Sequence, residues 1–553
     1  MANRRSNPPL LLLAVIGIVL YLAVIIGSVY LQTPGAAADT GADDPAITKQ
    51  EAAEAAAQFV QQRFGLSDDY RTSVLHQSYT VRHAYLEDAE LHDEYVKHFE
   101  NLPLNYFEVE INDAAKRATY YIDVDYSNQR IIGWEAYTTP ALRQRAAATA
   151  ATEPLQLAEQ AIIEQGFELE EFTRVREEPN VTAPERRDRP RPAVGTRYLY
   201  ESRDERIGEA TLHLTLSVAN GAVVSFHPVF NIPAAFLSWQ EQQDAKAALM
   251  TNISMGVSLA MTITALYIII RYRKEISFRR GWLLSLVFLA IYVTNNINML
   301  PALRAAHGAG PSQLQAIVYL CFVTALAVLM AVSVYFSLLA GTFLWRRQGW
   351  DPVAEWHDRD FGSQVMTATG RGYLLCLFIL GVQQGMYFIG SQYFDVWSVS
   401  DPSQSVLNML VPGIFPLLAW AAAISEEAIY RLFGIAFFLA LVRNRFLAVL
   451  LPSIVWAMSH TQYPIYPVYT RLVEVSIIGL IFGFFFLRYG FLTVLFAHAT
   501  MDSILMGVTL IDTGDGTQDV IGTFYLVFPA LVGWILSWLH RVTKRRDPQP
   551  TSS

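Results

Sequence analysis

Residues 417–442 read LLAWAAAISEEAIYRLFGIAFFLALV and contain only three charged side chains, Glu426, Glu427 and Arg431. A helix that crosses a bilayer needs about 20 mostly apolar residues, so this run is long enough to span a membrane. The preceding residues, 403–416, are also apolar but include two prolines. Because proline breaks a helix, we expect a short half-buried piece there, followed by a span over 417–442.

Similar apolar runs recur along the chain. With 417–442 they make ten expected spans, the others lying at 8–31, 247–270, 281–303, 314–343, 372–390, 446–466, 469–488, 491–511 and 520–540. The sequence therefore predicts a mainly α, polytopic helical membrane protein, and residues 35–245 add an α+β domain.

The composition supports this class. Hydrophobic residues make up 52% of the 553 residues and charged residues 16%, whereas soluble globular chains carry about 25% charged residues. These values argue against a disordered chain, a nucleic-acid-binding protein and an ordinary cytosolic enzyme. Only two cysteines are present, Cys321 and Cys376, which excludes a disulfide scaffold and a multi-cysteine metal centre.

Charge is divided unevenly between two parts of the chain. Residues 35–245 contain 35 Asp and Glu against 19 Lys and Arg, whereas residues 246–553 contain 15 against 20. Basic clusters follow alternate spans, and such clusters favour the cytoplasmic side. Ten spans then place both termini in the cytoplasm and residues 35–245 outside, in a multi-pass protein of the cell membrane.

The expected domains follow from these patterns. The first span is predicted to be an uncleaved anchor; the rival is a cleaved signal peptide, whose apolar region is usually shorter. Residues 33–46 are expected to form a flexible linker. The domains are an anchor at 1–34, an acidic extracytoplasmic domain at 35–245, accessory helices at 246–402, a catalytic core at 403–545 and a tail at 546–553.

The extracytoplasmic domain shows one pattern twice. A predicted helix at 47–65 precedes a hairpin at 119–136, and a second helix at 154–166 precedes a hairpin at 211–226 that turns at Asn220-Gly221. This order is similar to two PepSY-like or cystatin-like modules. Residues 174–197, rich in Pro, Arg and Glu, are expected to be a mobile loop within the second module. Four histidines of the first module are expected to be solvated: His76, His83, His92 and His98.

Several ionisable residues lie inside the last apolar runs, where each costs about 2.5–3.5 kcal/mol on insertion scales. Glu427 and Arg431 are four residues apart and can pair on one helix face, and His498 and Asp502 have the same spacing. Glu426 points away from the first pair, and its carboxylate suits a general base or acid. His460 adds a polar group from another span.

These segments resemble the CPBP family, the CAAX-protease and bacteriocin-processing (Abi) intramembrane endopeptidases. The family motifs EExxxR, FxxxH and HxxxN or HxxxD are matched in order by Glu426-Glu427-xxx-Arg431, Trp456-xxx-His460 and His498-xxx-Asp502. The resemblance covers roughly residues 403–508.

The resemblance implies an activity and a role for each residue. Glu426 and His460 would activate a water that attacks a peptide carbonyl, and His498 with Asp502 would support the oxyanion. Arg431 would order Glu426 and Glu427. Trp456 in place of Phe is expected to change packing only.

Asp502 stands where well-known members have Asn, and this difference leaves three alternatives open. An ionised Asp cannot donate a hydrogen bond, so Asp502 would be protonated or would fix the tautomer of His498. Alternatively, Glu426, His460, His498 and Asp502 would bind zinc, which accepts N and O ligands. A metal-free glutamic mechanism without a cofactor is the preferred prediction.

The helical rise gives a test of this arrangement. At 1.5 Å per residue, His498 would lie about 10 Å, His460 about 20 Å and Glu426 about 24 Å from the cytoplasmic ends of their spans. The three side chains can meet only if the predicted span ends are wrong or the helix that carries Glu426 projects from the bilayer. We expect the second case, with a site open toward the cytoplasmic half.

Two other function classes share these features. An ion-coupled transporter would use the same residues as an ion path, and a non-catalytic scaffold or immunity protein would keep the fold alone. The expected partners are a membrane-associated protein or peptide substrate and the lipid bilayer, but no nucleic acid. The extracytoplasmic domain is expected to bind a regulator or substrate.

Overall fold

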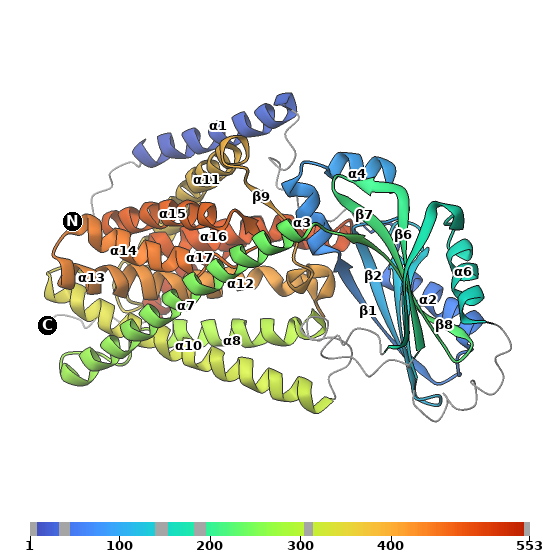
Figure 1. Cartoon of the computed structure of the whole chain (residues 1–553). Coiled ribbons are helices and arrows are strands. Elements are labelled where there is room, and N and C mark those ends of the chain that lie inside the picture. Colours follow the sequence, from blue (N-terminus) through green and yellow to red (C-terminus); the bar gives the residue numbers. More distant parts are fainter. Residues whose placement is uncertain are drawn as a thin grey trace, which may run out of the picture.

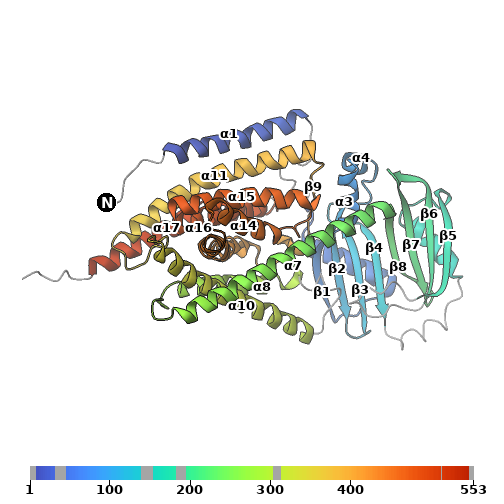
Figure 2. The ribbon, with the colours of Figure 1, turned by 60° about the vertical axis from the view of Figure 1, so that its left-hand side comes forward.

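A computed structural model describes residues 8–31, 45–138, 153–181, 195–302, 313–511 and 513–546. Figure 1 shows a bundle of long helices beside a domain built on a β-sheet, and Figure 2 shows the same arrangement after rotation. Helix α1 (Pro8–Leu31) begins, and α17 (Gly516–Arg546) ends, away from the sheet. Most of the predicted linker 33–46 and of the tail 546–553 lies outside the described residues.

The sheet domain contains a helix followed by four strands, twice. The first unit consists of α2 (Lys49–Phe64), β1 (Tyr70–Ser78), α3 (Thr80–Asp88), α4 (His92–His98), β2 (Asn105–Asp113), β3 (Ala118–Asp125) and β4 (Ile131–Thr138). The second consists of α6 (Pro154–Glu164), a 3₁₀ turn Leu169–Glu171, β5 (Phe172–Val181), β6 (Gly195–Ile207), β7 (Ala210–Ala219) and β8 (Ala222–Asn231).

The two units share one eight-stranded sheet in the order β1-β2-β3-β4-β8-β7-β6-β5. Every neighbouring pair is antiparallel, and the units join through their last strands, where Trp134 on β4 lies opposite Phe226 on β8. The two predicted helices and two predicted hairpins are thus present. The likeness to PepSY or cystatin modules stays a prediction.

Two expectations about the sheet domain are wrong. Residues 174–181 belong to β5, which pairs with β6; backbone hydrogen bonds form this edge strand, and they leave no mark in composition. Residues 182–194 of the predicted loop lie outside the described part. His76 and His83 are buried, at 3% and 2% exposure. His76 lies where β1 contacts the turn that contains Asn408, and the residues that follow His83 on α3 belong to the core of the sheet domain.

Among the described residues, seven helices are long and apolar enough to cross a membrane. They are Pro9–Ser28 of α1, α7 (Ala234–Arg271), Val318–Arg347 of α10 (Gln313–Arg347), α11 (Phe361–Tyr393), α15 (Val468–Tyr489), α16 (Phe491–Ile511) and Gly516–Lys544 of α17. Two shorter apolar helices, α8 (Trp282–Asn298) and α14 (Arg445–Met458), join them. The predicted count of ten spans stays a prediction, but a polytopic helical membrane protein is confirmed.

The predicted break at 403–416 is also present. Short 3₁₀ turns occupy Pro402–Gln404, Val406–Asn408 and Pro412–Leu417. They lead into one continuous helical segment made of α12 (Leu418–Glu426), a π-helical stretch (Glu427–Gly434) and α13 (Ile435–Val442). The prolines and the helical span therefore lie where the sequence placed them.

The two parts of the molecule share a packed junction. The strand pair β9 (Trp397–Ser398) and β10 (Ile465–Tyr466) belongs to the loops after α11 and α14. Trp397 and Tyr466 are both buried in the core of the sheet domain. Asn408 forms two hydrogen bonds with the backbone of His76 on β1, at 2.7 and 2.8 Å. The loops at this end of the helices are therefore held by the sheet domain.

Candidate active site

The central segment of the site is the π-helical stretch that begins at Glu427. All eight residues from Glu427 to Gly434 are buried. A π-helical turn widens a helix and is often found at functional sites. Glu426, the last residue of α12, is partly open, with 21% of its side chain exposed. The two adjacent glutamates therefore enter different environments.

Glu427 lies between two basic groups in the interior. Its Oε1 is 3.3 Å from Nη1 of Arg431 and 2.8 Å from Nδ1 of His498. The Glu427 side chain has no exposed surface, and that of Arg431 is 2% exposed. The expected Glu427–Arg431 pair is confirmed, and it also fixes His498 on α16.

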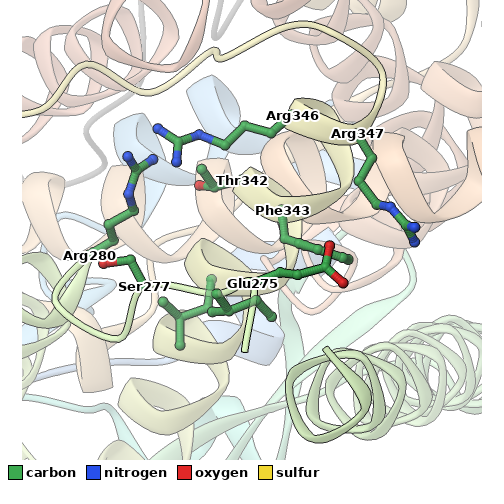
Figure 3. A pocket seen from close by; sticks show the side chains of 9 residues that line it. Glu275, Ser277, Arg280, Thr342, Phe343, Arg346 and Arg347 are labelled. Carbon is green, nitrogen blue, oxygen red and sulfur yellow. The ribbon is translucent and has the colours of Figure 1, made fainter. Parts of the chain in front are cut away.

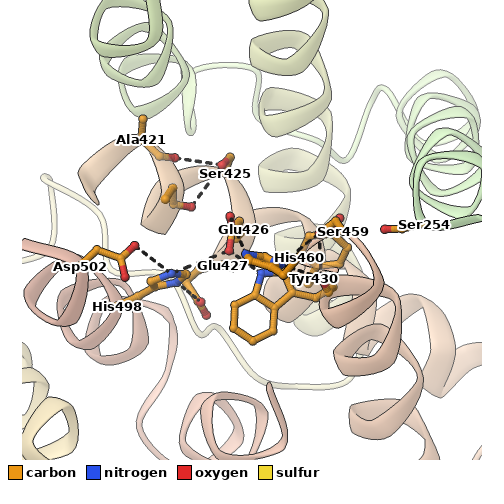
Figure 4. A network of polar contacts seen from close by, with 12 residues as sticks. Ser254, Ala421, Ser425, Glu426, Glu427, Tyr430, Ser459, His460, His498 and Asp502 are labelled. Carbon is orange, nitrogen blue, oxygen red and sulfur yellow. Dashed lines mark hydrogen bonds and ion pairs between the residues drawn. The ribbon is translucent and has the colours of Figure 1, made fainter. Parts of the chain in front are cut away.

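Glu426 faces the groups expected to do chemistry. Its Oε1 is 3.9 Å from Nε2 of His460, and its Oε2 is 3.8 Å from Nε2 of His498. The same Oε2 accepts a hydrogen bond from Nε1 of Trp456. Figure 4 shows Glu426, His460 and His498 pointing toward one another from separate segments of the chain.

The protonation of His460 follows from its neighbours. Its Nδ1 is 2.8 Å from the backbone oxygen of Trp456. A carbonyl oxygen only accepts, so Nδ1 carries the hydrogen, and the neutral ring presents the lone pair of Nε2. That lone pair faces Glu426.

His498 is surrounded by acceptors. Besides Glu427 at Nδ1, the Oδ2 of Asp502 lies 3.4 Å from Nε2. A carboxylate therefore lies beside each ring nitrogen, hydrogen-bonded at Nδ1 and in ion-pair contact at Nε2, and such neighbours favour the positively charged imidazole. The expected His498–Asp502 pair is confirmed.

The expectation that Trp456 changes packing only is wrong. Besides its hydrogen bond to Glu426, its ring lies under the guanidinium of Arg431, 3.9 Å from the ring centroid. An indole N–H in an apolar helix needs a partner when buried, and Trp456 is 3% exposed. This need for a hydrogen-bond partner is the feature of the sequence that could have predicted a polar contact of Trp456. Arg431, expected to order both glutamates, contacts Glu427, while Trp456 contacts Glu426.

The structure places His460 outside the helix in which it was predicted. The predicted span 446–466 would have buried His460 within a helix, but α14 ends at Met458 and His460 lies in the following loop. This loop continues into β10, which is packed on the sheet domain. His460 therefore reaches the cluster from the sheet-domain end, and the opening toward the cytoplasmic half stays a prediction.

A separate pocket of about 200 Å³ lies between the loop after α7 and the C-terminal part of α10 (Figure 3). Three arginines line it, but two of them are paired with carboxylates. Arg280 lies 3.6 Å from Asp351, and Nε of Arg346 donates to the same carboxylate at 2.7 Å. Because Asp351 compensates the charge of two of the three arginines, we do not expect the pocket to bind an anion. The pocket also shares no residue with the glutamate cluster.

Comparison with known proteins supports the motif assignment. Residues 408–504 match the family described as "Type II CAAX prenyl endopeptidase Rce1-like". This segment is similar to a CAAX-protease domain. It contains Glu426, Glu427, Arg431, His460, His498 and Asp502, so the resemblance seen in the sequence is confirmed. No curated protein and no solved structure matches the chain. The chain is thus a multi-pass membrane protein in which a segment similar to a CAAX-protease domain lies beside a sheet domain.

Proposed function

We propose that this protein is an intramembrane endopeptidase that hydrolyses a peptide bond of a membrane-associated protein or peptide. The observation that carries the proposal is the convergence of Glu426, His460 and His498 from α12, the loop after α14, and α16. Their polar atoms face one another within the domain that matches the protease family.

In the proposed reaction, Glu426 and His460 activate water. The 3.9 Å between Oε1 and Nε2 is too long for a direct hydrogen bond, and a water between the two atoms would contact both. The base takes a proton from the water as its oxygen attacks the carbonyl carbon. That proton then passes to the leaving amine as the C–N bond breaks, so the glutamate returns to its first state.

His498 would stabilise the negative oxygen of the tetrahedral intermediate. Its positive ring is fixed by Glu427 on one nitrogen and by Asp502 on the other. Charge that is oriented before the reaction lowers the barrier most in a water-poor site. Asp502 would act by orienting this ring and not as a donor itself.

We favour a metal-free reaction over a zinc mechanism because of the donor distances. Among the described residues, a single group brings three possible ligand atoms within 4.8 Å of one another, and that group lies in the sheet domain and not in the glutamate cluster.

The location of His460 suggests the side on which the substrate is cut. Because His460 enters from the loop packed on the sheet domain, we propose that substrates reach the site from the side of that domain. With the basic clusters in the cytoplasm, this is the outer face of the cell membrane. The sheet domain would then bind a substrate or regulator beside the site.

The test compares the protein termini of membranes from cells that carry the native chain or Glu426→Gln at equal abundance. Gln keeps the size and removes the base. Glu275→Gln is the matched control, since Glu275 is exposed in the loop after α7. Peptide ends that vanish only with Glu426→Gln would identify the substrates.

Unchanged termini in a folded Glu426→Gln protein would contradict proteolysis. Ion flux into vesicles that falls with the same substitution would favour a transporter. No change in either measurement would favour a non-catalytic scaffold.

A further inference from the structure

A second group of possible ligands lies in the sheet domain, far from the mechanism above. His83 and Glu87 are one helical turn apart on α3, and His92 is the first residue of α4. Residues four apart share a helix face. The turn at 89–91 brings His92 back toward that face, and Figures 1 and 2 show α3 and α4 next to each other at one end of the sheet.

The three side chains converge on one point. Oε1 of Glu87 is 3.4 Å from Nε2 of His83 and 3.1 Å from Nδ1 of His92. All three ligand atoms lie within 4.8 Å of one another. Zinc binds N and O at about 2.0–2.2 Å in a tetrahedron, and this geometry sets its ligand atoms about 3.4 Å apart.

His83 is the strongest sign of a missing partner. Its side chain is 3% exposed, and neither ring nitrogen makes a hydrogen bond with any described residue. A buried polar group without a partner costs about 1–3 kcal/mol. The 3.4 Å between Nε2 and Oε1 of Glu87 is not an aligned hydrogen bond, so the lone pair of Nε2 in the neutral ring is available to a cation.

The carboxylate lies between the two rings, with 14% of the Glu87 side chain exposed. His92 has 32% of its side chain exposed, so the cluster is open to solvent on that side.

We propose that His83, Glu87 and His92 form a binding site for a zinc-class divalent cation, with water as the fourth ligand. Two imidazoles and one carboxylate suit zinc and its neighbours in the first transition row and do not suit Mg²⁺ or Ca²⁺, which prefer oxygen ligands. The ion would link α3 to α4 across the turn that joins them.

This link lies next to the junction with the helices. Asp88, adjacent to Glu87, accepts a hydrogen bond at 3.3 Å from Nε1 of Trp397 on β9. Trp397 lies opposite Tyr466 on β10, in the loop that contains His460. A cation on α3 would therefore hold the end of the helix that contacts the loops beside the active site.

The test uses the full-length chain in detergent, with an affinity tag that contains no histidine. The protein is stripped with a chelator and titrated with Zn²⁺, and bound metal is measured by mass spectrometry. His92→Gln removes one ligand from a partly exposed position. His98→Gln is the matched control, because His98 is exposed on the same α4 and contacts only backbone.

The native chain and His98→Gln are expected to bind one equivalent of Zn²⁺ more than His92→Gln, and the ion should raise the Tm of the first two by several degrees. The difference between variants isolates this site even if the glutamate cluster also takes metal. Equal zinc content in native protein and folded His92→Gln would overturn the proposal.

Co²⁺ provides a measurement that does not depend on the folding of a variant. The stripped native chain is expected to show the strong visible absorption of tetrahedral Co²⁺, and Glu426→Gln should leave that absorption unchanged. A native chain without this absorption would also overturn the proposal.

Discussion

Arg431→Met provides the sharpest test of the buried charges beneath the active site. Methionine keeps an unbranched apolar side chain over the ring of Trp456 but removes the charge. Glu427, which has no exposed surface, then loses the partner at 3.3 Å and keeps only His498. Breaking a buried ion pair costs about 3–5 kcal/mol because one charge remains uncompensated. The loss of the cation–π contact at 3.9 Å contributes about 2 kcal/mol when desolvated, and the two effects overlap.

The assay is the free energy of unfolding in mixed micelles, titrated with SDS. Arg346→Met is the matched control, because the side chains of Arg346 and its partner Asp351 are 43% and 37% exposed. An exposed pair contributes about 0–1 kcal/mol, so the control should lose no more than that. The double variant Glu427→Gln/Arg431→Met should be more stable than Arg431→Met alone. Equal losses for Arg431→Met and Arg346→Met would refute the reasoning.

Three further outcomes follow from particular contacts. Trp456→Phe removes the N–H that donates a hydrogen bond to Glu426, the proposed base. A hydrogen bond to a charged group contributes about 1.5–3 kcal/mol, so kcat for peptide cleavage should fall by about 10- to 100-fold. An unchanged kcat would count against a role of Trp456 in holding Glu426. Gly381→Leu would place a side chain into the backbone of Gly17, whereas the control Gly256→Leu meets open space; only the first should abolish cross-linking between cysteines placed on α1 and α11. The pKa of Glu87 is lowered to about 2, so the ionised carboxylate contributes its full stabilisation above about pH 4.5 and loses it as the pH falls toward 2. In protein without metal, the Tm difference between the native chain and Glu87→Gln should therefore shrink over that pH range. A constant Tm difference would contradict the lowered pKa.

Local spacing was enough to predict much of the site. Glu427 with Arg431, and His498 with Asp502, are each four residues apart, and the structure pairs both. A helix brings such residues together whatever the rest of the chain does. The motif order also predicted that Glu426 would belong with the two histidines, although spacing alone could not bring three segments together.

Contacts between distant segments could not be read from spacing. The hydrogen bond from Trp456 to Glu426 joins residues 30 positions apart. The strand β5 depends on pairing with β6, and the burial of His83 depends on how α3 folds over the sheet. The hydropathy pattern predicted a span over 446–466, but α14 ends at Met458. Apolar residues after the helix, such as Tyr466, pack on the sheet domain and do not continue the helix.

The sequence by itself determined that this is a helical membrane protein with a CAAX-protease motif set. Long apolar runs have few alternatives to spanning helices, because backbone groups in lipid must bond within their own segment. Only the tertiary structure decided that His460 enters from the sheet-domain end, that Trp456 holds Glu426, and that His83, Glu87 and His92 converge. Each of these depends on the packing of chain segments against one another, which fixes distances that no local pattern contains.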